Sequence, residues 1–116
     1  MSHFSTLRTK VTDAAILTSA LNDLGISVQT DADVRGYNGQ QIRADIVAVL
    51  EGEYDLGWSQ NADGSFDLIA DLWGVAKRHN QTELINSINQ KYAINKTLSE
   101  VKRTGLNNAN VSLVLQ

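Results

Sequence analysis

Residues 34–73, VRGYNGQQIRADIVAVLEGEYDLGWSQNADGSFDLIADLW, decide the fold of this chain. The stretch contains three apolar runs, separated by turns that carry glycine. Asn38-Gly39 predicts a tight hairpin, because both residues adopt positive φ at low cost. Residues 61–64, Asn-Ala-Asp-Gly, predict a longer hairpin turn with its glycine in the left-handed region. The stretch therefore predicts an antiparallel meander.

The longest expected strand covers residues 41–51, and its side chains alternate between two faces. One face is apolar throughout and carries Ile42, Ala44, Ile46, Ala48 and Leu50. The other face is apolar only at its centre, at Val47 and Val49. We expect the first face to be buried and the second to be half covered.

The next two expected strands, residues 54–59 and 66–73, each have one apolar and one acidic face. Their apolar faces carry Trp58 and Phe66, and we expect both side chains to lie under the helices. The acidic face would then lie in solvent, with Asp55, Asp67 and Asp71.

The chain before this stretch predicts a strand over residues 3–10, followed by a helix. Thr12 fits the N-cap of that helix, and Gly25 fits the residue just beyond its end. One helical face is apolar and is formed by Ile16, Leu17, Ala20, Leu21 and Leu24. The elements expected next are a short strand, a polar turn and a second extended piece, at residues 26–29, 30–33 and 34–37.

The chain after the stretch predicts one long helix over residues 81–104. Asn80 and Glu83 resemble a capping box at its start, and Lys102 and Arg103 lie in its last turn, where cations are favourable. The apolar stripe shifts near Ala93, so either the helix breaks there or its two halves pack against different neighbours. The absence of glycine and proline favours one continuous helix. A final strand is expected over residues 110–115.

Runs of strands with flanking helices are typical of the α+β class. We expect residues 1–116 to form a single domain: a two-layer sandwich with a largely antiparallel sheet and two helices on one face. A length of 116 residues fits one domain.

Composition narrows the function classes. The chain has no cysteine, which removes disulfides, cysteine zinc sites and thiol chemistry. The net charge of -3 does not favour a nucleic-acid partner. No secretory signal and no apolar run of about 20 residues are present, so we expect no membrane partner and a soluble protein of the cytoplasm or plastid stroma. No cofactor is expected, since neither a phosphate-binding nor a dinucleotide-binding glycine motif occurs.

The loop at residues 35–41 is the most site-like stretch. Its candidate ligand-binding residues are Arg35, Tyr37, Gln40 and Gln41. An arginine, a tyrosine and amides on a glycine-containing loop can bind an anion or the edge of a peptide. The same pattern also fits a plain hairpin whose tyrosine packs on a neighbouring side chain.

Three weaker candidates each have an ordinary structural interpretation. His3 and His79 could join Asp67 or Asp71 in a metal site, but their spacing matches no metal motif, and two solvated histidines are expected. The three aspartates of the acidic face could form an acid–base or cation site, but a solvated sheet face is expected. Residues 77–79, Lys-Arg-His, could hold a phosphate beside the helix N-terminus, but an ordinary surface is expected. No catalytic motif occurs, so no catalytic residue is assigned.

Several motifs together resemble one family. They are MSHFSTLRTKVTDAAILTSALNDLGI at the N-terminus, then VRGYNGQ, YDLGW, FDLIADLW and QKYAINKTL. In this combination and order they resemble the hypothetical chloroplast reading frame thirty-five family, an uncharacterised group of cyanobacteria, their phages and algal plastids. The likeness extends to about Gly105. Family members continue into a hairpin with a basic terminal strand, whereas NVSLVLQ carries no basic residue. The resemblance implies a photosynthetic setting and supplies no catalytic residues.

Two functional hypotheses follow. The first is a non-enzymatic module that binds a protein partner, either at a sheet edge or through Trp58, Trp73 and Tyr37. The second is a small-ligand or anion binder, or a minor enzyme, that uses Arg35, Tyr37 and Gln40. The sequence sets neither the partner nor the oligomeric state.

Overall fold

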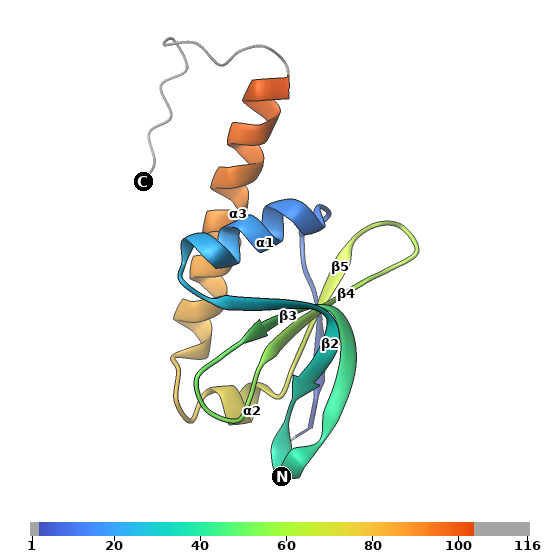
Figure 1. Ribbon diagram of the computed structural model, residues 1–116, viewed down its shortest axis with the longest axis vertical. Helices are drawn as coiled ribbons and strands as arrows, with labels where there is room; N and C mark the ends of the chain where they lie inside the picture. The colour runs from blue at the N-terminus through green and yellow to red at the C-terminus, as the bar shows by residue number, and fades with distance from the viewer. Residues whose placement is uncertain (1–2, 104–116) are drawn as a thin grey trace.

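A computed structural model describes residues 3–103 of the chain. It contains one antiparallel sheet of five strands in the order β1-β5-β4-β3-β2 (Figure 1). The strands are β1 (Ser5–Arg8), β2 (Ser27–Arg35), β3 (Gln41–Val49), β4 (Leu56–Gln60) and β5 (Phe66–Ala70). Strands β2 to β5 follow one another as a meander, and β1 pairs with the last of them. The predicted α+β class and antiparallel meander are confirmed.

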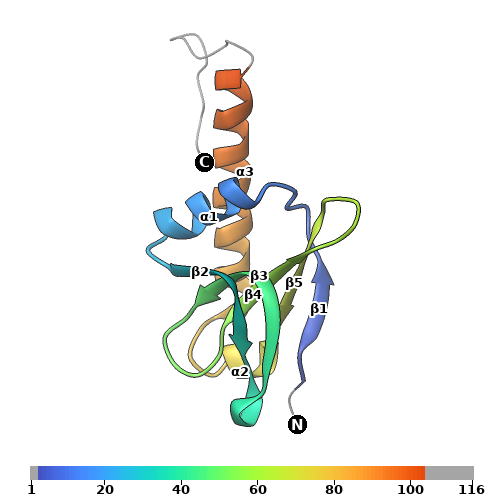
Figure 2. The ribbon, with the colours of Figure 1, turned by 45° about the vertical axis from the view of Figure 1, so that its right-hand side comes forward.

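Helix α1 (Ala14–Asp23) and helix α3 (Gln81–Arg103) lie on the same face of the sheet, and a short helix, α2 (Leu72–Val75), follows β5 (Figures 1 and 2). The N-cap of α1 is Asp13, not Thr12 as predicted: its carboxylate accepts the N–H of Ile16 at 3.1 Å. The reason lies in α3, because the hydroxyl of Tyr92 accepts the N–H groups of both Thr12 and Asp13. This contact holds Thr12 just outside the helix.

Helix α3 is continuous, as predicted. The carbonyl oxygen of the Asn80 side chain accepts the N–H of Glu83 at its start, which confirms the expected cap. The first half of the helix packs on the core through Ile88 and Tyr92. The second half extends past the sheet (Figure 1), and Leu98 there is 37% exposed. The strand expected over residues 110–115 lies outside the described residues.

The main core lies between the sheet and the two long helices. Trp58 is 2% exposed and is aligned with Ile46 on β3 and Leu68 on β5. Phe66 belongs to the same cluster. The predicted burial of Trp58 and Phe66 under the helices is therefore confirmed.

The second face of the sheet carries a smaller core, which the chain makes by folding its own hairpin back. Val34, Ala44 and Val47 form this cluster. Ala44 was expected to share a face with Ile46, and that prediction is wrong. The hairpin changes face between the pairs Thr30↔Ile46 and Ala32↔Ala44.

Asp31 lies at this point and has a φ of 48°, so β2 is kinked there but continues. The polar turn predicted for residues 30–33 is thus wrong. Beyond the kink, the hairpin crosses β4 at Gly57. A methyl group at Gly57 would lie 2.3 Å from Cγ2 of Val34, so only glycine permits this approach.

Candidate functional site

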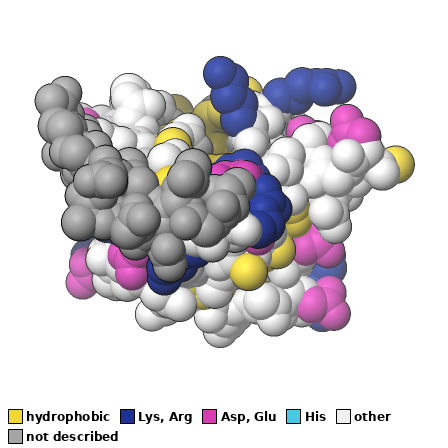
Figure 3. All heavy atoms as spheres, turned by 90° about the horizontal axis from the view of Figure 1, so that it is seen from above, with side chains coloured by type: hydrophobic (Ala, Val, Ile, Leu, Met, Phe, Trp, Pro, Cys, Tyr) yellow, Lys and Arg dark blue, Asp and Glu magenta, His cyan; other side chains and the backbone are white. Residues whose placement is uncertain are grey.

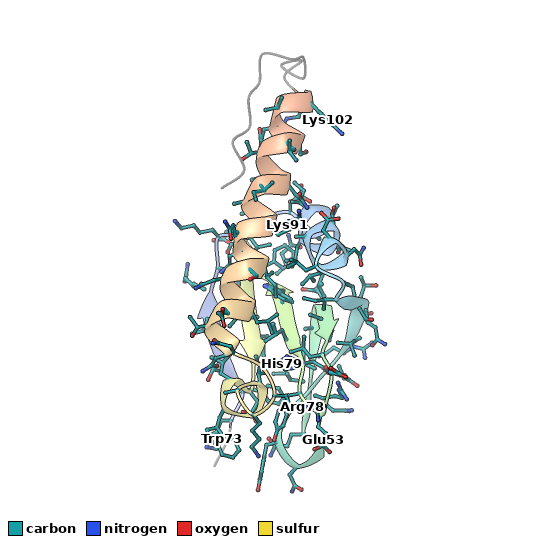
Figure 4. The ribbon with its side chains drawn as sticks, turned by 90° about the vertical axis from the view of Figure 1, so that its left-hand side faces the viewer. Glu53, Trp73, Arg78, His79, Lys91 and Lys102 are labelled. Atoms are coloured by element: carbon teal, nitrogen blue, oxygen red, sulfur yellow. The ribbon has the colours of Figure 1, made fainter. Side chains whose placement is uncertain are left out.

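Aromatic side chains gather where the tip of the β2–β3 hairpin, the start of β4 and helix α2 meet. We call this surface the aromatic end and define it as Tyr37, Tyr54, Trp73 and Lys77. Trp73 is 55% exposed and Tyr37 is 40% exposed. The ammonium of Lys77 lies 4.1 Å from the centre of the Trp73 ring and 6.0 Å from that of Tyr54. Figure 4 shows Trp73 at one end of the molecule, with Lys102 at the other.

Tyr54 is fixed because its ring lies directly on the backbone of α2. A methyl group at Gly74 would lie 1.9 Å from Cε2 of Tyr54, so any other residue would displace the ring. Partial burial of the phenol raises the pKa of Tyr54, and the negative charges of Asp71 and Glu53 raise it further. At neutral pH the hydroxyl therefore stays protonated.

Asp71 joins the hairpin tip to α2. One carboxylate oxygen accepts the N–H of Gly74 at 3.1 Å and caps the helix, and the other accepts the N–H of Tyr37 at 3.2 Å. Asp71 is 1% exposed, so its predicted position in solvent is wrong. The predicted strand was drawn too long: β5 ends at Ala70, and Asp71 begins a helix.

Asp55 was also predicted in solvent and is also 1% exposed. Its carboxylate accepts the side-chain Nε and Nη2 of Arg35, at 2.8 and 2.7 Å, and the backbone N–H of Arg35 at 3.0 Å. It also accepts the buried N–H of Leu50 at 3.2 Å. Asp55 lies just before β4, where the outer part of the β2–β3 hairpin crosses that strand. The crossing brings Arg35 over the Asp55 carboxylate and shields it from solvent.

Arg35 is thereby committed to the structure. Besides Asp55, its guanidinium donates to the carbonyl oxygens of Gly52 at 2.7 Å and Leu50 at 2.9 Å. Four of the five N–H donors of an arginine are used in this way. The hydrogen bond to Asp55 is the largest cause of a raised pKa for Arg35. These bonds fasten the base of the hairpin tip to the turn before β4.

The four predicted ligand-binding residues of the loop therefore do not form one site. Asn38 and Gly39 have φ of 56° and 76°, as expected for a tight hairpin. Tyr37 joins the aromatic end, Arg35 holds the loop, and Gln40 and Gln41 are exposed beyond the tip. The aromatic end thus takes one member from the predicted set.

The basic residues 77–79 lie in the turn after α2, and Figure 4 shows Arg78 and His79 there. Together with Glu51 and Glu53, they line a small pocket of about 140 Å³. Nε2 of His79 lies 3.1 Å from the carbonyl oxygen of Glu51. The two glutamates offset the positive charge around this pocket, so its electrostatics do not favour an anion.

The structure also bears on two other predicted sites, the interface residue Trp58 and the metal site. Trp58 cannot anchor an interface because it is buried in the main core. Within residues 3–103, no group of three His, Cys, Asp or Glu side chains is placed to hold a metal ion.

The sequence does not predict Tyr54 as a site residue, and it predicts Lys77 only as part of a candidate phosphate site. The available signal was the sequence Asp71-Leu-Trp-Gly74, an N-cap residue followed three positions later by the glycine that admits the Tyr54 ring. The alternation that predicts a strand as far as Trp73 conceals this cap, because β5 ends at Ala70.

Comparison with known proteins gives the family. A model described as a protein of unknown function, DUF1257, matches residues 20–112. The chain belongs to the DUF1257 family. It is 34% identical over 111 residues to the "Uncharacterized protein ycf35" of Guillardia theta, covering 95% of this chain and 86% of that relative. It is 28% identical over 106 residues to the protein of the same name from Pyropia yezoensis, covering 90% and 82%.

The predicted resemblance to the reading frame thirty-five family is therefore confirmed. No solved structure matches the chain. None of the helices within residues 3–103 combines the length and the hydropathy that a membrane span requires.

Proposed function

We propose that this protein is a non-enzymatic interaction module that binds a protein partner through the aromatic end. The observation that supports this most directly is Trp73, the most exposed large apolar side chain among residues 3–103. Tryptophan and tyrosine are enriched in the few residues that dominate binding energy at protein interfaces. An exposed tryptophan beside two tyrosines provides such an anchor.

The surface is also held in place before binding, which lowers the entropy lost on association. Asp71 fixes the start of α2 and the backbone of Tyr37, and the Tyr54 ring packs on Gly74. Lys77 stacks on Trp73 as a cation–π pair. The partner would therefore meet a rigid aromatic surface rather than a loop that must first order.

The alternative, a small-ligand or anion site at Tyr37, Gln40 and Gln41, has weaker support. The neighbouring pocket, at about 140 Å³, is smaller than the roughly 300–1,000 Å³ typical of ligand sites. Arg35, the cation of that proposal, already donates to Asp55 and two carbonyl groups. A thermal-shift screen against nucleotides, sugar phosphates and metals tests it, since a ligand at a hundred times its Kd stabilises a protein by about 2.7 kcal/mol.

We also propose a setting. The named relatives come from algae, and a photosynthetic microbe, a plastid or a cyanophage is the setting that fits them. Within such a cell we propose the cytoplasm or the plastid stroma as the place of action.

Quantitative affinity enrichment from a cyanobacterial lysate tests the proposed function. Wild type is compared with Trp73→Ala and with Leu24→Ala, which removes another exposed apolar side chain (39% exposed) at the C-cap of α1. A specific partner should be enriched by wild type and by Leu24→Ala, and lost with Trp73→Ala. Equal enrichment by all three baits would remove the aromatic end as the binding surface.

A further inference from the structure

Strand β1 forms one edge of the sheet, and its outer side is a second candidate binding surface besides the aromatic end. β1 ends the sheet, and among the described residues no strand pairs with its outer side (Figure 2). All four of its residues are exposed. In an antiparallel pair, alternate residues direct their N–H and C=O groups away from the partner strand. The outer side of β1 therefore presents backbone donors and acceptors in strand geometry.

The opposite edge of the sheet, β2, is less suited to pairing. β2 is kinked at Asp31, and its distal half folds back over β4. A regular extended segment could not follow it along its length. Of the two edges, β1 is the one whose residues pair in unbroken register with the neighbouring strand and include no positive φ.

A groove of about 780 Å³ adjoins β1 on the helix side. It lies between the segment 8–11 and helix α3, and apolar side chains on both walls include Val11, Tyr92 and Ala93. Leu7 on β1 is 43% exposed and borders a smaller neighbouring pocket with Ile85 of α3. One face of a strand added to β1 would therefore meet apolar atoms.

The charged residues that line the groove indicate which kind of partner segment it would bind. Its charged lining residues are Arg8, Lys10, Lys96 and Glu100. Nζ of Lys96 lies 3.8 Å from a carboxylate oxygen of Glu100, so Arg8 and Lys10 carry the net positive charge of the lining. This local excess of positive charge stands in a chain of net charge -3. Seen from above, basic, acidic and apolar side chains are interspersed on this face of the molecule (Figure 3). A second copy of the same edge would bring like charges together, since cations on edge strands oppose self-pairing. An acidic partner would be attracted instead.

We propose that the β1 edge and its groove bind an extended segment of a partner protein in which apolar residues alternate with acidic ones. The segment joins the sheet as a further strand beside β1. Its apolar side chains face the helices and contact Leu7 and the α3 wall of the groove. Its carboxylates lie on the alternate face and approach Arg8 and Lys10. Backbone hydrogen bonds supply affinity, and the alternating side chains supply specificity. This surface is independent of the aromatic end.

The test uses a fluorescein-labelled decapeptide of alternating valine and glutamate, with the full-length protein, in a fluorescence-anisotropy titration. Two control peptides are a valine–lysine decapeptide and a valine–glutamate decapeptide methylated on every backbone nitrogen. The glutamate peptide should bind at least ten-fold more tightly than either control. Its binding should also weaken as salt is raised.

Matched protein variants locate the site. The double variant Arg8→Glu, Lys10→Glu should weaken binding of the glutamate peptide at least ten-fold. Lys102→Glu changes charge elsewhere on α3 and should leave binding unchanged, as should Trp73→Ala. This last variant separates failure of the β1 proposal from failure of the aromatic end. Thermal melts confirm that each variant is folded.

Hydrogen exchange gives the decisive readout. The outward-facing amides of β1 should exchange quickly in the free protein and slow down when the glutamate peptide binds. Equal binding of the glutamate and lysine peptides, or undiminished binding of the methylated peptide, would overturn the proposal. So would β1 amides already protected in the free protein, because another segment would then cover the edge.

Discussion

The substitution Asp55→Ala should be among the most damaging single changes in this protein. It removes the acceptor of four hydrogen bonds, three from Arg35 and one from the buried N–H of Leu50. Breaking a buried ion pair by deleting one partner costs about 3–5 kcal/mol. The Arg35 side chain is 37% exposed, so water partly solvates its stranded charge. We therefore expect a loss near the lower end, about 3 kcal/mol.

Urea unfolding followed by circular dichroism measures this loss. With a slope of about 1–3 kcal/mol per molar, the midpoint should fall by roughly 1–3 M. Asp33→Ala is the matched control, because Asp33 also pairs with an arginine, Arg43, but at 3.4 Å and with side chains 43% and 61% exposed. Such a pair contributes about 1 kcal/mol at most. Equal midpoints for the two variants would refute the role assigned to the Arg35–Asp55 pair.

Three further predictions concern the core and the aromatic end. Trp58→Ala should lower the free energy of unfolding by about 3–5 kcal/mol in urea melts. Asp67→Ala, which removes the acceptor of a hydrogen bond from Asn61, should lower it by about 1 kcal/mol at most. The reverse order would mean that the buried face is misassigned. Gly74→Ala should destabilise by about 1–3 kcal/mol through overpacking, and by less in a Tyr54→Ala background, so additive losses would contradict the ring contact. Since the pKa of Tyr54 is raised above its ordinary value of 10.0, the unfolded chain loses this proton first and the stability contributed by the neutral phenol falls as pH rises above 10. The difference in phenolate absorbance between wild type and Tyr54→Phe should show a midpoint above 10, and one at or below 10 would contradict the burial of the ring.

Local patterns were sufficient to predict much of the fold. Asn38-Gly39 adopts the two positive φ angles that its residue types favour. Trp58 and Phe66 face the helices because alternation within a regular strand fixes the face of every side chain. Helix α3 runs unbroken because no residue in it interrupts the backbone hydrogen bonds.

Local patterns do not predict that the β2–β3 hairpin folds back over β4. Ala44 was assigned to the main core by continuing the alternation of β3, but the kink at Asp31 on the neighbouring strand changes the face. The space that receives Val34 exists because residue 57 is glycine, more than 20 residues later. Such a contact between distant residues leaves no periodic signal in the sequence.

The candidate site was predicted only in part for the same reason. Tyr37 and Trp73 are two of the three aromatic residues predicted at an interface, and both are exposed, whereas the third, Trp58, is buried. Asp55 and Asp71 were placed in solvent because alternation was extended past the true ends of β4 and β5. Their burial depends on Arg35 and on the backbone of Tyr37, which the folded hairpin brings to them.

The central claim is that Trp73 anchors a protein partner at the aromatic end. Its most direct test is the Kd of the partner identified by affinity enrichment, measured by isothermal titration calorimetry for wild type, Trp73→Ala and Leu24→Ala. An interface anchor contributes at least about 2 kcal/mol, so Trp73→Ala should weaken binding about 30-fold or more. Leu24→Ala should bind like wild type. A Kd for Trp73→Ala within about two-fold of the wild-type value would contradict the claim.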